Sequence, residues 1–120
     1  MPVQPLTPNL SPRIKVWLAW KGGFLMGPNY FRFLESVDET GTIREAGRAV
    51  GWSYRTCLNR IRKMESVLGG RVLITSRGGV SHGSATLTPE ARYLVQLFGK
   101  WRTDMHRLSD TAFRRAARRR

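Results

Sequence analysis

Apolar residues alternate with other residues near the start of the chain and then recur at helical spacing. From residue 14 to residue 20 every second position is apolar, which is the period of a half-buried strand. Gly22 and Gly23 permit a tight turn into a second strand at residues 24–26. The pattern predicts a hairpin, with Trp17, Trp20 and the more distant Trp52 as core anchors.

Three segments then place apolar residues on one helical face. Residues 30–40 have them at i, i+3, i+4 and i+7, and Asn29 is the predicted N-cap. The second segment runs to residue 50 and opens with capping-box spacing between Thr42 and Glu45, which predicts two reciprocal hydrogen bonds. The third, residues 53–68, opens with Ser53 as a cap. A glycine follows each segment, so we expect three separate helices.

Two short segments, residues 71–75 and 84–87, flank a glycine-rich stretch at residues 77–83. They predict an antiparallel hairpin with an extended tip. Thr88, Pro89 and Glu90 then supply a cap, a proline at the first helical position and an acid in the first turn. A long fourth helix should follow.

The second and third predicted helices, joined by Gly51 and Trp52, have the lengths of a helix-turn-helix. Ala46, Gly47 and Ala49 are small enough to let the two helices approach. The fold class we expect is mainly α with small β: a winged helix-turn-helix with an N-terminal hairpin and a long C-terminal dimerisation helix.

The third helix should turn one face inward and one outward. The inward residues are Cys57, Leu58, Ile61, Met64 and Leu68. A rotation of about 100° per residue leaves these outside: Arg55, Thr56, Asn59, Arg62 and Lys63. Arginine pairs with guanine and asparagine with adenine through two hydrogen bonds each, so Arg55 and Asn59 are the predicted base readers. Arg60, Arg62 and Lys63 are assigned to phosphates, and the alternative is a merely solvated face.

The glycine-rich hairpin would be a second anchor, because its backbone can approach phosphates closely. A flexible hairpin without contacts is the alternative. The full set of expected DNA-binding residues is Thr42, Arg44, Ser53, Tyr54, Arg55, Thr56, Asn59, Arg60, Arg62, Lys63, Arg77, His82 and Ser84.

From residue 94 to residue 112 the apolar positions of the fourth helix are spaced four, three, four, three and four apart. This is a heptad seam, and a helix projecting from a small domain would expose it. We expect it to pair two copies of the chain, although packing on its own domain is the alternative. The predicted dimerisation residues are Leu94, Phe98, Trp101, Met105 and Leu108.

The charge adds a partner to this picture. The 120 residues hold 21 lysines and arginines against 8 acids, a formal net charge of +13, which indicates a polyanionic partner. Double-stranded DNA and an anionic membrane surface would both attract a chain of this charge. The predicted helix-turn-helix favours DNA. The expected organisation is a flexible proline-containing leader at 1–12, a DNA-binding domain at 13–88, the dimerisation helix at 89–113 and a basic tail at 114–120 that adds phosphate contacts.

Catalytic and metal-binding groups are sparse. The two histidines lie in different predicted elements, and no acid pair stands out as a general acid and base. The single cysteine, Cys57, is interpreted as a core thiol, with a redox switch as the rarer alternative. We therefore expect no enzyme activity, metal, cofactor or small-molecule effector.

The stretch from Gly41 to Arg55, GTIREAGRAVGWSYR, resembles the N-terminal DNA-binding domain of ModE-type molybdate-responsive regulators, which share a winged helix with LysR-type regulators. The likeness extends over residues 13–105, including the glycine-rich hairpin. Full-length members add a molybdate-binding domain, which we do not expect in this chain. Gly47, Cys57 and Leu58 replace the family's common alanine, alanine and tryptophan, and Ser84 replaces a glycine.

These observations predict a homodimeric, sequence-specific transcriptional regulator of the bacterial cytoplasm (nucleoid), with residues 53–68 in the major groove. Architectural DNA binding with little sequence preference and a protein-interaction winged helix are the two alternatives.

Overall fold

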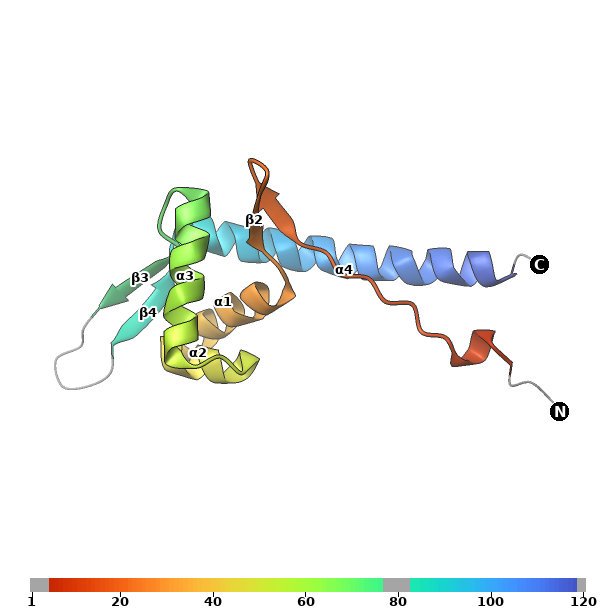
Figure 1. Ribbon diagram of the computed structural model, residues 1–120, viewed down its shortest axis with the longest axis horizontal. Helices are drawn as coiled ribbons and strands as arrows, with labels where there is room; N and C mark the ends of the chain where they lie inside the picture. Colours follow the sequence, from red (N-terminus) through yellow and green to blue (C-terminus); the bar gives the residue numbers. More distant parts are fainter. Residues whose placement is uncertain (1–4, 77–82, 119–120) are drawn as a thin grey trace.

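The computed structural model describes residues 5–76 and 83–118. It is mainly helical, with two small antiparallel sheets, as predicted (Figure 1). The elements in chain order are the 3₁₀ turn η1 (Thr7–Asn9), β1 (Leu18–Trp20), β2 (Gly23–Met26), α1 (Pro28–Thr40), α2 (Ile43–Val50), α3 (Tyr54–Leu68), β3 (Leu73–Ser76), β4 (Ser84–Leu87) and α4 (Pro89–Arg118).

The N-terminal hairpin is shorter than predicted. Its first strand begins at Leu18, and its turn is Lys21-Gly22, where both φ angles are positive at 48° and 87°. Two successive positive φ angles match the type I′ turn that two-residue hairpins favour. The expectation that Trp17 and Trp20 anchor the core is wrong, because their side chains are 55% and 39% exposed.

Helix α1 begins before the predicted cap. Asn29 lies inside the helix, while Gly27 is the N-cap residue, makes no side-chain capping bond and is followed by Pro28. Proline suits this place because its fixed φ fits the first turn and it has no N–H to leave unpaired. At the other end Gly41 adopts φ 77° and stops the helix as predicted.

One hydrophobic cluster joins β2, every helix and both strands of the second hairpin. Phe33, Leu34 and Val37 of α1 are at most 1% exposed and lie at its centre. Helix α3 turns Cys57 and Met64 toward them. The side of α3 opposite this cluster carries exposed residues and is free for a partner; in Figure 1 this helix lies in front of α4 and β4.

The second hairpin is fastened to the body at its base. Thr88 N–H donates to the Val72 carbonyl at 3.0 Å, and Ala85 N–H donates to the Gly41 carbonyl at 2.8 Å. The Thr88 hydroxyl donates to the Arg71 carbonyl and accepts from the Ala91 N–H, at 2.9 and 3.1 Å. The predicted cap of the fourth helix is thus confirmed, and it also holds the hairpin.

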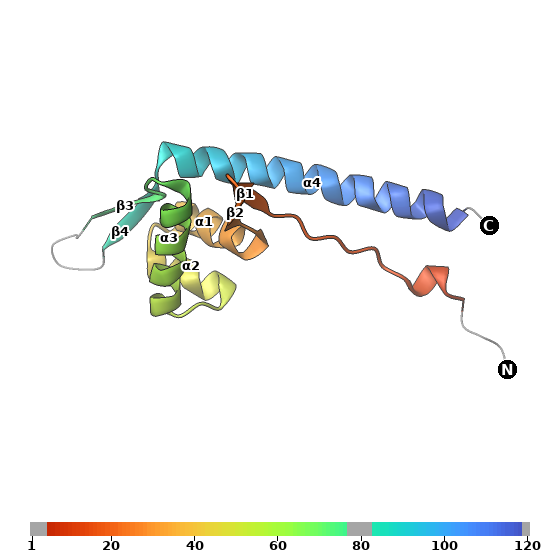
Figure 2. The same ribbon diagram turned by 45° about the horizontal axis from the view of Figure 1, so that its top comes forward.

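Helix α4 has 30 residues, which is about 45 Å at 1.5 Å per residue. Its first half packs on the domain, and the rest extends past it in both views (Figures 1 and 2). The predicted boundary at residue 113 is wrong, since the helix continues to Arg118. Part of the basic tail is therefore helical and presents its arginines along a rod.

Candidate nucleic-acid interface

Helices α2 and α3 meet where Gly47 leaves no room for a side chain. A Cβ at residue 47 would lie 2.5 Å from the Sγ of Cys57 and 2.9 Å from the Trp52 carbonyl oxygen. The Trp52 N–H donates to the Gly47 carbonyl at 2.9 Å, and Gly51 closes α2 at φ 73°. Gly47 and Cys57, which stand where the regulators that the sequence resembles commonly have alanine, are therefore complementary in volume.

Cys57 is fully buried in this crossing. Its Sγ lies 3.9 Å from the Ile43 carbonyl, and burial raises the pKa of the thiol above its ordinary value. A buried, protonated thiol is a weak nucleophile. The interpretation of Cys57 as a core residue is confirmed.

The N-terminus of α3 is capped as predicted. Ser53 Oγ accepts from the Thr56 N–H at 3.1 Å, and it lies 3.1 Å from Thr56 Oγ1, to which it can donate. In that arrangement Thr56 Oγ1 is the acceptor, so its own hydrogen points elsewhere. Thr56 can then donate to an external acceptor such as a phosphate oxygen.

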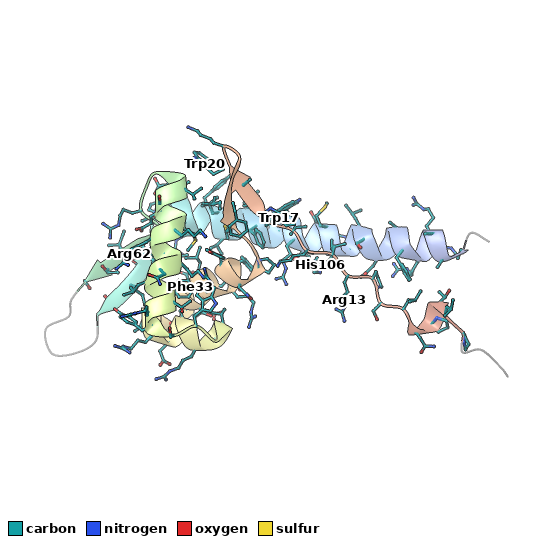
Figure 3. All side chains as sticks on the ribbon, in the orientation of Figure 1. Arg13, Trp17, Trp20, Phe33, Arg62 and His106 are labelled. Atoms are coloured by element: carbon teal, nitrogen blue, oxygen red, sulfur yellow. The ribbon has the colours of Figure 1, made fainter. Side chains whose placement is uncertain are left out.

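The outward face of α3 is polar and basic. Cys57, Ile61 and Met64 are buried, and the rotation of the helix leaves the opposite side exposed. Its exposed residues are Arg55, Asn59, Arg62 and Lys63, and Figure 3 shows Arg62 on the side of α3 away from Phe33. The predicted base readers and two of the three predicted phosphate contacts therefore share one accessible face.

Arg44 of α2 and Tyr54 of α3 are stacked across the turn. The guanidinium lies 4.3 Å from the centre of the Tyr54 ring, and Arg44 and Tyr54 are both exposed. A cation over an aromatic ring is attracted by the negative face of that ring. The stack therefore orients the Arg44 charge beside the beginning of α3.

Arg60 differs from the other predicted phosphate contacts. Its side chain is half-buried and its guanidinium lies 5.7 Å from the centre of the Trp52 ring. Trp52 in turn packs against Tyr30 and Phe33, with centroid distances of 5.6 and 5.2 Å. Arg60 thus braces the turn, and its contact with phosphate stays a prediction.

The predicted capping box of α2 is only half formed. Thr42 Oγ1 accepts from the Glu45 N–H at 3.1 Å. The predicted reciprocal bond, from Thr42 N–H to the Glu45 carboxylate, does not form. Thr42 N–H instead donates to Thr40 Oγ1 at 3.4 Å, and the Glu45 carboxylate pairs with Arg48 at 2.8 Å. Thr42 Oγ1 thus accepts the capping bond and keeps its own hydrogen to donate, so its contact with DNA stays a prediction.

Three DNA contacts were predicted in the second hairpin, β3–β4, and one of these residues, Ser84, is described by the structure. Ser84 is exposed and its hydroxyl lies 2.6 Å from that of Ser76 on the paired strand. Arg77 and His82 lie outside the described residues.

The cations of the α3 face have no carboxylate partner among the described residues. The four ion pairs among the described residues lie elsewhere in the fold and involve Arg48, Arg71, Arg92 and Arg107. Arg44, Arg55, Arg62 and Lys63 are in none of them. Their charge is therefore available to an anionic partner.

The predicted dimerisation residues divide between two environments. Phe98 is 0% exposed and its ring lies 5.1 Å from that of Phe31, so its assignment to a dimer contact is wrong. The side chain fills the core of its own domain. Leu94 and Trp101 are half-buried against the same core, and Met105 is also half-buried. The heptad seam thus begins as an intramolecular contact.

The apolar seam on the surface of α4 keeps Trp101, Met105 and Leu108 and has Leu97 in place of Phe98. Leu108 is 55% exposed, and Leu97, which the sequence reasoning missed, is 40% exposed. With Trp101 and Met105 they span an arc of about 80° at 100° per residue. Leu97 precedes Trp101 by four residues and Leu108 by eleven, a spacing that could have identified it.

Arg32 is a second residue that the sequence reasoning missed. Its guanidinium donates to the Ala49 carbonyl at 2.9 Å. This satisfies a carbonyl in the last turn of α2, where helical partners run out. Arg32 therefore ties α1 to the helix-turn-helix.

Residues 5–76 and 83–118 contain no group of three or more histidine, cysteine or acidic side chains placed to hold a metal ion. Among these same residues, no helix combines the length and the apolar character needed to cross a membrane.

Several known proteins are similar to this chain. The molybdenum-pterin-binding protein MopB of Rhodobacter capsulatus is 32% identical over 77 residues, which are 64% of this chain and 28% of MopB. The molybdenum transport protein ModE of Herbaspirillum seropedicae is 30% identical over 73 residues, 61% of this chain and 26% of that protein. The chain therefore spans roughly a quarter of the length of these relatives.

A solved structure has the same fold. The BenM DNA-binding domain, crystallised with benA site 1 DNA, superposes with a TM-score of 0.56 at 20% identity and covers 76% of this chain and 96% of its own. The family model of bacterial regulatory helix-turn-helix proteins of the lysR family matches residues 28–92. Since that match spans more than half of the 120 residues, the chain belongs to the lysR family of bacterial regulatory helix-turn-helix proteins.

Proposed function

We propose that the chain is a sequence-specific, DNA-binding transcriptional regulator that places α3 in the major groove. The observation that carries the proposal is the exposed face of α3, where Arg55 and Asn59 stand near the N-terminal end of a helix held rigidly at the Gly47 crossing. Recognition helices contact base edges with their N-terminal residues. Arg55 is assigned to guanine and Asn59 to adenine.

The remaining cations are assigned to the phosphate backbone. Arg62 and Lys63 follow on the same face of α3, and the Arg44–Tyr54 stack flanks its beginning. Phosphate contacts fix the register of a protein on the duplex and make binding depend on salt. Asn59 Oδ1 lies 3.5 Å from Arg62 Nη1, and since an amide oxygen has two lone pairs it can also accept from a base.

We also propose that two copies pair through α4. Leu97 and Leu108 leave apolar surface exposed on a helix that extends beyond its domain, and Trp101 lies between them. An antiparallel pairing keeps apart the two C-terminal ends, each carrying Arg114, Arg115 and Arg118. The two recognition helices would then be related by a two-fold axis, which predicts a palindromic site.

Two other functions remain as outcomes of the test. An architectural protein would bind duplex DNA through its +13 charge without sequence preference. A protein-interaction module would not shift duplex DNA even at low salt. Cytoplasmic location at the nucleoid follows from the proposed partner, and no effector or catalytic activity is proposed.

The proposal is tested by selecting bound sequences from random duplex DNA with the wild-type chain and with Arg55→Ala. We expect a palindromic motif for the wild type and loss of preference at one base per half-site for the variant, worth about 1–3 kcal/mol. Arg48→Ala is the matched control, because Arg48 is an exposed arginine of α2 paired with Glu45. The absence of any motif for the wild type would refute sequence-specific binding.

A further inference from the structure

A groove of about 480 Å³ opens beside the N-terminal hairpin and is lined by Trp17, Phe24, Pro28 and Tyr30, with Lys15 at its edge. It does not include any residue of the α3 face. Trp17 is 55% exposed and Phe24 is 44% exposed, which is unusual for side chains that can gain so much from burial. The proposed DNA contacts give these aromatic rings no role.

The walls of the groove are held in place by packing. The Phe24 ring meets the edge of the Tyr30 ring at a centroid distance of 5.4 Å. A Cβ on Gly27 would lie 3.5 Å from Phe24 Cζ and 3.6 Å from Trp17 Cβ, so both side chains close over this glycine. The result is a preformed aromatic channel rather than a loose hydrophobic surface.

Channels lined with aromatic side chains take up proline-rich segments in the polyproline II conformation, which needs little further ordering. This chain carries such a segment. Its first eight residues, MPVQPLTP, place Pro2, Pro5 and Pro8 at every third position. Because polyproline II has 3 residues per turn, these prolines align on one edge. Residues 5–10 are all exposed.

The direction of the leader indicates which copy it meets. In Figures 1 and 2 the chain before the first hairpin runs outward on the same side as the C-terminal half of α4, away from β2 and α1, the elements that supply Phe24 and Tyr30 to the groove. An antiparallel pairing through α4 would place the partner's domain on that side. Residues 5–13, at about 3.3 Å each when extended, reach about 30 Å.

We propose that the proline-rich leader of each copy docks in the groove formed by Trp17, Phe24 and Tyr30 of a second copy. The inference rests on the proposed homodimer for its geometry, and it adds an exchanged N-terminal arm as a second contact. Docking requires opening the single turn η1. Its hydrogen bonds run from Asn9 N–H to the Leu6 carbonyl, from Leu10 N–H to the Thr7 carbonyl and from Asn9 Nδ2 to the Pro5 carbonyl, at 3.0, 3.1 and 2.7 Å. That turn buries no residue, so little packing opposes its opening.

The direct test uses an equal mixture of ¹³C-labelled and unlabelled full-length chain. Isotope-filtered NOE spectra of this mixture report only contacts between different copies. We expect cross-peaks from the Pro5 and Pro8 rings to the Trp17 indole. The absence of these cross-peaks between different copies would overturn the proposal.

A thermodynamic test follows from the same contacts. In sedimentation equilibrium, the double substitution Pro5→Ala and Pro8→Ala, and separately Trp17→Ala, should each raise the dimer dissociation constant by about tenfold or more, as loss of an aromatic anchor does. The matched controls are Pro12→Ala, which is off the three-residue period, and Trp20→Ala, an exposed hairpin tryptophan outside the groove. Both controls should leave the constant unchanged.

The outcomes separate this inference from the homodimer itself. If Leu108→Asp dissociates the dimer while the leader and Trp17 variants do not, the α4 pairing stands and the exchanged arm is refuted. If Trp17→Ala and Trp20→Ala weaken the dimer equally, the groove is not the specific contact and the proposal also fails. DNA binding is measured separately on each variant.

Discussion

The crossing of α2 and α3 makes a quantitative prediction about Gly47 and Cys57. Gly47→Ala replaces a helical glycine, which by itself would stabilise the helix by about 1 kcal/mol. Here the new Cβ would stand 2.5 Å from Cys57 Sγ and 2.9 Å from the Trp52 carbonyl. Overpacking of a rigid core costs about 1–3 kcal/mol. With two such contacts we expect the upper end of that range, and a net loss of about 2 kcal/mol.

Cys57→Ala alone should cost about 1 kcal/mol, since it deletes one buried heavy atom. In the double variant the sulfur contact disappears and only the carbonyl contact remains. The double variant should therefore be more stable than the sum of the two single effects by at least about 1 kcal/mol, which is well above ordinary additivity error of about 0.5 kcal/mol.

The assay is urea unfolding followed by tryptophan fluorescence, for the wild type, both single variants and the double variant. Gly70→Ala is the matched control, because a Cβ there would meet nothing within 4 Å. Two results would refute the conclusion that the Gly47–Cys57 contact determines how closely α2 and α3 approach. One is a double variant whose change in unfolding free energy equals the sum of the single changes. The other is a Gly47→Ala variant as stable as the wild type.

Three further predictions concern other parts of the fold. Thr88→Ala should lower stability by about 1–2 kcal/mol in thermal unfolding, because it removes the α4 cap and the bond to the Arg71 carbonyl; Thr86→Ala, exposed on the adjacent strand, is the control, and equal effects would contradict the capping role. Leu97→Asp should yield a monomer in sedimentation, whereas Thr103→Asp, exposed on α4 and at least about 120° around the helix from the seam, should not; a dimeric Leu97→Asp would exclude the seam. Since burial raises the Cys57 thiol pKa, the unfolded thiol ionises first as pH rises, so stability should fall above the ordinary thiol pKa in the wild type and not in Cys57→Ala; parallel pH profiles would be inconsistent with a buried thiol.

The helix-turn-helix was predictable because local signals and periodicity agree there. Ser53 and Thr42 cap their helices, and Gly51 ends α2 in the left-handed region. The inward and outward faces of α3 follow directly from helical rotation. These residues needed no knowledge of distant contacts.

The errors arose where a local pattern competes with tertiary packing. Phe98 fits a heptad seam, yet its ring packs against Phe31 of α1 in the core. No sequence spacing reveals that contact. Trp20 fits the alternation of a half-buried strand but is 39% exposed at the end of β1, and Trp17 precedes that strand and is 55% exposed. At Asn29, the proline one residue earlier decides where the helix begins.

The central claim is that Arg55 on α3 reads a base, and competition binding tests it most directly. The affinity of the wild-type chain for its selected duplex and for random duplex is measured at physiological salt, beside Arg55→Ala. We predict a preference of about 10³ or more for the selected duplex. We predict that Arg55→Ala lowers that preference about tenfold or more while leaving random-duplex affinity nearly unchanged. Equal weakening on both duplexes would contradict the claim, because it would make Arg55 a phosphate contact and leave α3 without its main reader.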